Sequence, residues 1–188
     1  MIRTLSNVIG VDDCPFPRGH RGDVAVVGAV FASDRLDGVL TTKIRRDGAN
    51  ATDRLAAMIL GSRFDDHIQA VLLQGIALGG FNVVDVHRLS ATLGRPVLVV
   101  ARRAPRMGAI ERALLGPVPG GARKWRLIER AGPMEPLAGV WVQRAGLELA
   151  EAEALLAAHI RHGSLPEPLR VAHILAGGFA TGASRGRA

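Results

Sequence analysis

Two adjacent carboxylates, Asp12 and Asp13, follow a predicted strand over residues 6–11 and could carry out chemistry at its end. Because neighbouring side chains on a strand point to opposite faces, one carboxylate can face a cleft while the other caps a loop. Carboxylate oxygens are the hard ligands that Mg²⁺ requires, and a bound Mg²⁺ polarises phosphate and activates water. The alternative is structural, since Asp also caps turns such as the proline-rich segment 14–22 that comes next.

Residues 74–82 form a glycine-rich segment between a predicted strand (70–73) and a predicted helix (81–93). Glycines such as Gly79 and Gly80 let backbone amides approach a phosphate, and the N-terminus of a helix favours an anion. The segment has neither the Walker nor the GxGxxG pattern of nucleotide-binding loops. Tight packing between strand and helix explains the glycines equally well.

Two arginine-rich clusters supply further candidate contacts to phosphate, although a solvated surface is the usual role of such clusters. They consist of Arg102, Arg103 and Arg106, and of Arg123, Lys124, Arg126 and Arg130. The chain carries 24 Lys and Arg against 17 Asp and Glu, a formal net charge of +7. A net positive charge favours a polyanion such as nucleic acid, but a GC-rich genome also produces arginine-rich chains.

The composition excludes several classes of protein. A chain of 188 residues with 48% hydrophobic and 22% charged residues is neither disordered nor of low complexity, and it fits a single domain over residues 1–188. A single cysteine, Cys14, excludes a disulfide scaffold and a cysteine-based zinc site. The longest uncharged apolar stretch, residues 24–32, is about half as long as a membrane-spanning helix. With no signal-peptide pattern at the start, we expect a cytoplasmic protein with no membrane partner.

The order of the predicted elements indicates a mixed α/β sandwich. Valine-rich segments with short connections predict three antiparallel strands, after which helices alternate with short buried strands, as in parallel sheets. The predicted strands cover 6–11, 24–32, 36–44, 70–73, 97–100 and 140–142. A first predicted helix begins at a cap, Asn50 or Thr52, and carries an apolar stripe of Leu55, Met58 and Ile59. The other predicted helices cover 81–93, 110–115, 122–130, 147–159 and 166–175. This order matches the ribonuclease H-like architecture and places a basic cleft at the ends of the first and fourth strands.

Five segments spread along the chain resemble the family called domain of unknown function 99, a relative of endonuclease V. They are residues 8–13, 36–40, 80–85, 166–173 and 184–188. The resemblance covers nearly the whole chain and implies a ribonuclease H-like fold, with three antiparallel strands followed by parallel strands in one mixed sheet flanked by helices. Endonuclease V enzymes search for deaminated bases, notably inosine, and cut the strand nearby with carboxylate-bound Mg²⁺.

The resemblance also implies a set of site residues. Asp12 matches the first-strand metal ligand of endonuclease V, whereas the central Asp of those enzymes falls on Gln74 and their late Asp falls on His173. Asp12 and Gln74 are therefore the expected metal ligands, and Asp12 and His173 the expected catalytic residues. With so few carboxylates, the site should hold at most one divalent ion, Mg²⁺ or Mn²⁺, and bind it weakly. Because histidine titrates near neutral pH, His173 could act as a general acid or base; the alternative is a polar residue on a core-facing helix.

Two functions remain open from the sequence, and both have nucleic acid as the expected partner. The first is a divergent metal-dependent nuclease acting on DNA or RNA, and the second is a nucleic-acid-binding module that keeps the basic cleft without activity. A small-molecule pocket built on the glycine-rich segment is a third. The sequence indicates no oligomeric state. The expected nucleic-acid contacts are Gly79, Gly80, Asn82, Arg102, Arg103, Arg170, Arg185 and Arg187.

Overall fold

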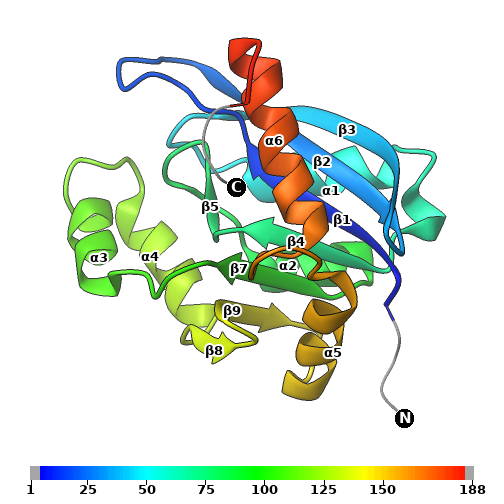
Figure 1. Ribbon diagram of the computed structural model, residues 1–188. Coiled ribbons are helices and arrows are strands. Elements are labelled where there is room, and N and C mark those ends of the chain that lie inside the picture. The colour runs from blue at the N-terminus through cyan, green and yellow to red at the C-terminus, as the bar shows by residue number, and fades with distance from the viewer. Residues whose placement is uncertain (1–4, 185–188) are drawn as a thin grey trace.

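The computed structural model describes residues 5–184, whose strands form a seven-stranded sheet at the centre of the protein (Figure 1). Strands β1 (Asn7–Asp13), β2 (Asp23–Ala32) and β3 (Arg35–Arg45) form an antiparallel meander. Strands β4 (Ala70–Gln74) and β7 (Val97–Ala101) run parallel to β1, and β9 (Val140–Ala145) and β8 (Glu135–Leu137) return antiparallel. The order across the sheet is β3-β2-β1-β4-β7-β9-β8. The predicted mixed sheet, three antiparallel strands followed by parallel strands, is confirmed.

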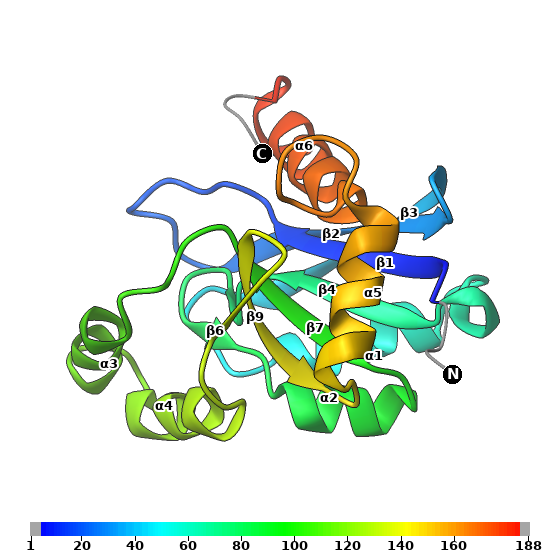
Figure 2. The same cartoon turned by 60° about the horizontal axis from the view of Figure 1, so that its bottom comes forward.

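Helices cover both faces of the sheet and the region beyond one of its ends (Figures 1 and 2). One face carries α1 (Ala51–Leu60) and α2 (Val86–Leu93), and the other carries α5 (Leu149–His159) and α6 (Glu167–Thr181). Helices α3 (Met107–Leu115) and α4 (Gly121–Arg130) lie beyond the carboxyl ends of β4 and β7. The short elements are η1 (Asp65–His67), β5 (Ala77–Leu78) and β6 (Asn82–Val83). Among residues 5–184, no helix combines the length and hydropathy needed to cross a membrane.

The central strands are apolar on both sides because both sides are covered. Along β4, Val71 and Leu73 belong to the core under α1 and α2, whereas Leu72 belongs to the core under α5 and α6. Successive side chains on a strand point to opposite faces, so a strand with helices on both sides reads as a continuous apolar run. This explains why the runs at 70–73 and 97–100 could be recognised as buried strands.

The prediction of a helix over 81–93 is wrong in its first part. Residues 82–83 pair with residues 77–78 as a short hairpin, and α2 begins only at Val86. The carboxylate of Asp85 accepts the N–H of Arg88 at 3.1 Å, which caps the first turn of α2. The start of α2 is thus set by this cap, whereas the spacing of apolar residues alone had suggested an earlier start. Three smaller differences remain. Helix α3 begins at Met107 and α6 continues to Thr181. Strand β8, which was not predicted, pairs with β9 and forms that edge of the sheet.

Helix α6 lies directly on β1 at Gly10. A Cβ atom added to Gly10 would come within 2.3 Å of the carbonyl carbon of Pro168 and 2.7 Å of the nitrogen of Leu169. Both contacts are to backbone, so a rotamer change could not relieve them. Gly10 therefore permits a close approach of helix to strand that any other residue would prevent.

We expect Gly10→Ala to lower the free energy of unfolding by about 2–3 kcal/mol, because α6 must move away from the sheet. Urea unfolding followed by circular dichroism measures the change. Gly19→Ala is the matched control, since a Cβ there meets nothing within 4 Å, and its effect should stay within about 0.5 kcal/mol. A Gly10→Ala protein as stable as the control would contradict the packing argument.

Candidate functional site

Asp12 and His173 meet although they are 161 positions apart in the chain. His173 Nδ1, on α6, lies 2.7 Å from Asp12 Oδ2, at the carboxyl end of β1. Asp12 is only 6% exposed, whereas the His173 side chain is 37% exposed. The pair therefore consists of a buried carboxylate and an imidazole that remains in reach of solvent.

A cavity of about 470 Å³ brings the predicted site residues together. Asp12 and Gln74 reach it from the adjacent parallel strands β1 and β4, and His173 reaches it from α6. In open α/β sheets, ligands bind outside the carboxyl ends of the strands, which is where this cavity lies. Its lining consists of Asp12, Asp13, Pro15, Gln74, His173, Ile174, Gly177, Thr181 and Ser184.

Burial raises the pKa of Asp12 to about 6. The hydrogen bond with His173 acts in the opposite direction, and the neighbouring charge of Asp13 adds to the rise. Asp12 Oδ1 also accepts the N–H of Asp13 at 2.9 Å. The carboxyl group of Asp12 can therefore exchange a proton with its surroundings close to neutral pH, which an ordinary aspartate cannot do.

Asp13 holds the glycine-rich turn. Its Oδ2 accepts the N–H of Gly79 at 3.0 Å, and burial raises the pKa of Asp13. On the other side of the turn, Asp47 Oδ1 accepts the N–H of Phe81 at 2.8 Å, and a Cβ on Gly80 would lie 2.4 Å from that oxygen. The amide of Gly79, one of those predicted to contact a phosphate, and the nearby amide of Phe81 are thus occupied by the protein's own carboxylates.

Asn82 is fully buried and serves the fold. Its Oδ1 accepts the N–H of Ala51 at 3.0 Å, and its Nδ2 donates to the carbonyl of Arg45 and to Asn50 Oδ1, each at 2.8 Å. The amide therefore caps α1, a role that the sequence assigned to Asn50 or Thr52. Within residues 5–184, both Nδ2 hydrogens of Asn82 are used and the side chain is buried, so it does not reach the surface for the predicted contact with nucleic acid.

Gln74 carries a buried oxygen that lacks a partner. Within residues 5–184, Gln74 Oε1 accepts no hydrogen bond. Leaving a buried acceptor unpaired is costly, so this atom suits a water molecule or a cation. Asp12 and Gln74 together offer the oxygen ligands that a single divalent ion accepts. The described part of the chain contains no cluster of three or more His, Cys, Asp or Glu residues for a stronger site.

The predicted arginine contacts differ in their surroundings. Arg102 and Arg103 are exposed and directly follow β7, at the same edge of the sheet as Gln74. Arg170 is half-buried, and its guanidinium binds both carboxylate oxygens of Glu167 at 2.5 and 2.7 Å, so its charge is balanced. Arg185 and Arg187 lie outside the described residues.

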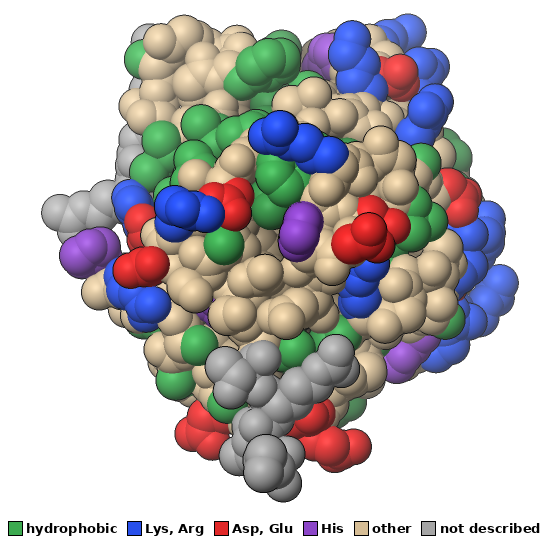
Figure 3. All heavy atoms as spheres, turned by 90° about the vertical axis from the view of Figure 1, so that its right-hand side faces the viewer, with side chains coloured by type: hydrophobic (Ala, Val, Ile, Leu, Met, Phe, Trp, Pro, Cys, Tyr) green, Lys and Arg blue, Asp and Glu red, His purple; other side chains and the backbone are tan. Residues whose placement is uncertain are grey.

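The opposite end of the sheet offers a different surface. This side, at the right of Figure 1, contains the beginnings of β1 and β4, and across its middle basic and acidic side chains are interspersed (Figure 3). Mixed charge of this kind gives a polyanion no continuous positive surface.

Sequence reasoning missed Asp47, which organises the loop between β3 and α1. Its N–H donates to the carbonyl of Gly79 at 2.9 Å, and its backbone has a left-handed φ of 51°. The pair Asp47-Gly48 is a turn signal in the sequence. Nothing local, however, connects that turn to the glycine-rich segment more than thirty positions later.

Comparisons with known proteins agree on one family and one fold. A family model described as "Endonuclease dU" matches residues 5–180. A UPF0215 protein of Deinococcus radiodurans is 58% identical over 183 residues, which cover 97% of this chain and 93% of that protein. The crystal structure of a protein of unknown function from Archaeoglobus fulgidus superposes with a TM-score of 0.86 at 35% identity, over 93% of this chain and 98% of the other. Endonuclease V of Ciona intestinalis, solved with DNA containing an inosine followed by a ribo-adenosine, superposes with a TM-score of 0.56 at 12% identity. The superposition covers 89% of this chain and 82% of the other.

The raised pKa of Asp12 makes a prediction about stability and pH in metal-free buffer. A carboxyl whose pKa is higher in the folded state stabilises the fold below about pH 4, and this contribution is lost as pH rises to about 6. Asn at position 12 does not titrate. We therefore expect Asp12→Asn to gain roughly 3 kcal/mol of stability relative to wild type between pH 4 and pH 7.

Chemical denaturation with a chelator present, repeated across this pH range, measures the gain. Asp34→Asn, an exposed position, is the control for loss of one negative charge. A difference between Asp12→Asn and wild type that stays constant from pH 4 to pH 7 would show that folding does not raise the pKa of Asp12.

Proposed function

The chain belongs to the endonuclease dU family, and from this membership and the geometry of the site we propose that it is a metal-dependent endonuclease that cuts DNA near deaminated bases. The observation that carries the proposal is the Asp12–His173 pair, which lines the same cavity as Gln74, a residue with an unpartnered buried oxygen. The family description refers to deoxyuridine, and the Ciona relative was solved with inosine-containing DNA. Uracil and hypoxanthine are both products of base deamination, so a deaminated base is the substrate feature that they share.

Asp12 and Gln74 would hold the divalent ion. When bound, such an ion polarises the scissile phosphate and lowers the pKa of water. A carboxylate has about four lone-pair positions, so Asp12 can accept from Asp13 and His173 and still bind a cation. A small set of two protein oxygens leaves the remaining positions around an ion to water and to substrate.

His173 is the proposed general acid or base. Its Nδ1 is occupied by Asp12, which leaves Nε2 as the ring nitrogen that can exchange a proton. When Asp12 is ionised, it holds the proton of the imidazole on Nδ1 and leaves Nε2 as a base. The partial exposure of His173 in the cavity allows this nitrogen to reach water or a substrate oxygen.

The reduced number of carboxylates supports a second candidate function, a nucleic-acid-binding module without catalysis. The neutral Gln74 sits where endonuclease V enzymes are expected to have an Asp, as the resemblance implied. Loss of negative charge near a phosphate strengthens binding to nucleic acid and weakens binding of metal. The two candidates therefore respond in opposite ways to removal of the Asp12 charge.

A cleavage assay separates the two candidates. We expect the wild-type protein to cut labelled oligonucleotides that contain deoxyuridine or deoxyinosine in the presence of Mg²⁺ or Mn²⁺. Asp12→Asn should lose cutting because the ion loses its only charged ligand, and His173→Ala should slow it about 100-fold or more. His67→Ala, an exposed histidine at the opposite end of the sheet, is the control and should cut normally.

Absence of cutting by the wild type with either ion, together with binding that Asp12→Asn leaves equal or tighter, would reject the nuclease and favour the binding module. Unmodified oligonucleotides cut as fast as the deaminated ones would reject the substrate class alone.

Contact of Arg103 with the phosphate backbone is tested by the salt dependence of binding. Each phosphate contact contributes about one to the slope of log affinity against log salt concentration. We expect Arg103→Ala to reduce that slope by about one, as measured by fluorescence anisotropy with a labelled oligonucleotide. Arg35→Ala is the control, because Arg35 is paired with Asp37 at the other end of the sheet. Equal slopes for Arg103→Ala and wild type would place the nucleic acid elsewhere.

A further inference from the structure

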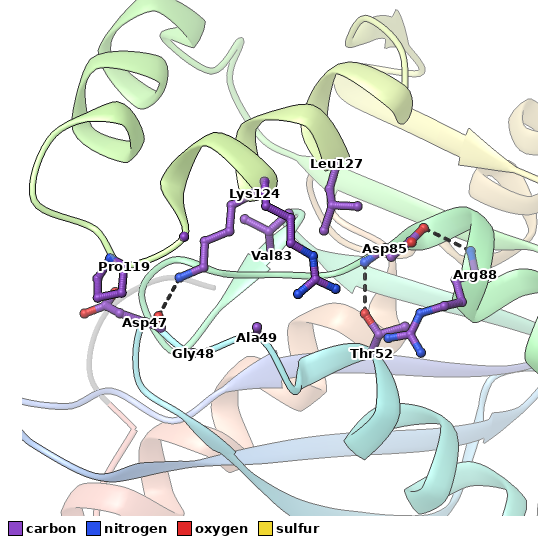
Figure 4. A pocket seen from close by; sticks show the side chains of 12 residues that line it. Asp47, Gly48, Ala49, Thr52, Val83, Asp85, Arg88, Pro119, Lys124 and Leu127 are labelled. Atoms are coloured by element: carbon purple, nitrogen blue, oxygen red, sulfur yellow. Dashed lines mark hydrogen bonds between the residues drawn. The ribbon is translucent and has the colours of Figure 1, made fainter.

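A second cavity, of about 300 Å³, lies on the side of the glycine-rich turn away from Asp12. Asp13 binds Gly79 from the side of the candidate active site, whereas Asp47, which binds Gly79 and Phe81, lines this second cavity. Helices α1, α2 and α4 each contribute residues near their first turns (Figure 4). The polar side chains of these helices and of Asp85 that line the cavity are Thr52, Asp85, Arg88, Arg123 and Lys124.

Lys124 is a buried cation in the wall of this cavity. It is 4% exposed, and its Nζ donates to the backbone carbonyl of Asp47 at 2.5 Å (Figure 4). An ammonium group has three donors, and within residues 5–184 only this one is used. Burial lowers the pKa of Lys124 although the carboxylate of Asp47 attracts its ammonium group, and a bound anion would offset this cost of burial.

Two arginines add positive charge. Both lie near Asp53: Arg88 is paired with it at 2.5 Å, and the charge of Arg123 also acts on its carboxylate. In addition, Gly120 precedes α4 with φ +67°, and this N-cap residue supplies no side-chain acceptor to the first turn. The N-terminal end of a helix carries a partial positive charge and favours an anion.

The two acidic residues of the cavity, Asp47 and Asp85, are each also paired with an arginine that does not line it. Asp47 accepts from the N–H of Phe81 and lies 3.3 Å from the guanidinium of Arg46. Asp85 accepts from the N–H of Arg88 and pairs with the guanidinium of Arg130. The cavity is therefore positive where Lys124 and the uncapped end of α4 line it.

We propose that this second cavity binds a phosphate monoester, with Arg123 and Lys124 as its ligands and with Val83, Pro119 and Leu127 in contact with the apolar part of the ligand. Its volume is at the lower end of the range for small-molecule sites, which fits a mononucleotide or a terminal nucleotide. A free nucleotide and the phosphorylated end of a DNA strand present the same chemical group. This site is independent of the proposed nuclease activity.

Isothermal titration of the full chain with inorganic phosphate, UMP, AMP and a short oligonucleotide with or without a 5′-phosphate tests the proposal. We expect Arg123→Ala to weaken binding of the best of these probes about tenfold to 100-fold. Arg126→Ala is the matched control, because Arg126 is exposed on the same helix but does not line the cavity. Lys124→Met, which keeps the length of the buried stem, should weaken binding similarly if its thermal unfolding shows that it remains folded.

Each outcome decides the proposal or identifies the ligand. Tighter binding of UMP or AMP than of the phosphorylated oligonucleotide supports the site with a free nucleotide, and the reverse order supports it with a strand end. No binding of any phosphate-bearing probe, or equal weakening by Arg123→Ala and Arg126→Ala, overturns it. Binding of inorganic phosphate, UMP and AMP is measured without a divalent ion and without any cutting, so failure here is distinguishable from failure of the nuclease.

Discussion

Strand β1 and helix α6 touch at the level of their backbones, where Pro168 lies on Gly10. From that contact, Asp12 is two residues along the strand and His173 is five residues along the helix. A strand rises about 3.3 Å per residue and a helix about 1.5 Å, so both side chains are roughly 7 Å beyond the contact. Both residues lie a short way beyond this contact, where Nδ1 approaches Oδ2 to 2.7 Å. A single missing side chain thus sets the geometry of the candidate site.

Backbone N–H groups of the glycine-rich turn between the two cavities donate to the protein's own carboxylates. Asp13 binds it from one side and Asp47 from the other, and these carboxylates occupy amides that would otherwise attract phosphate. Any phosphate group must then be held by side chains or by a helix end. Arg103 after β7, and Arg123 and Lys124 at the second cavity, are the side chains proposed for this purpose.

Features that depend on one segment could be predicted from the sequence, and features that join distant segments could not. The strands at 70–73 and 97–100 were recognised because helices on both faces make them continuously apolar. Asp12, Gln74 and His173 were selected by the family resemblance, and the fold brings them to one cavity. The cap that Asn82 gives to α1, the role of Asp47 and the burial of Lys124 were missed. Each depends on contacts between residues more than thirty positions apart, which local periodicity does not record.

The packing of β1 under α6 also determines when the site can form during translation. Strand β1 is synthesised first among the described elements and α6 last, yet they are neighbours in the finished protein. A nascent chain can pair β1 with β2 and β3 while it is still attached to the ribosome, but it has no imidazole beside Asp12 until residue 173 has emerged. Until then the apolar face of β1 that α6 covers is open to chaperones or to other chains. Premature termination before α6 would therefore yield a chain without the site and with a surface prone to aggregation.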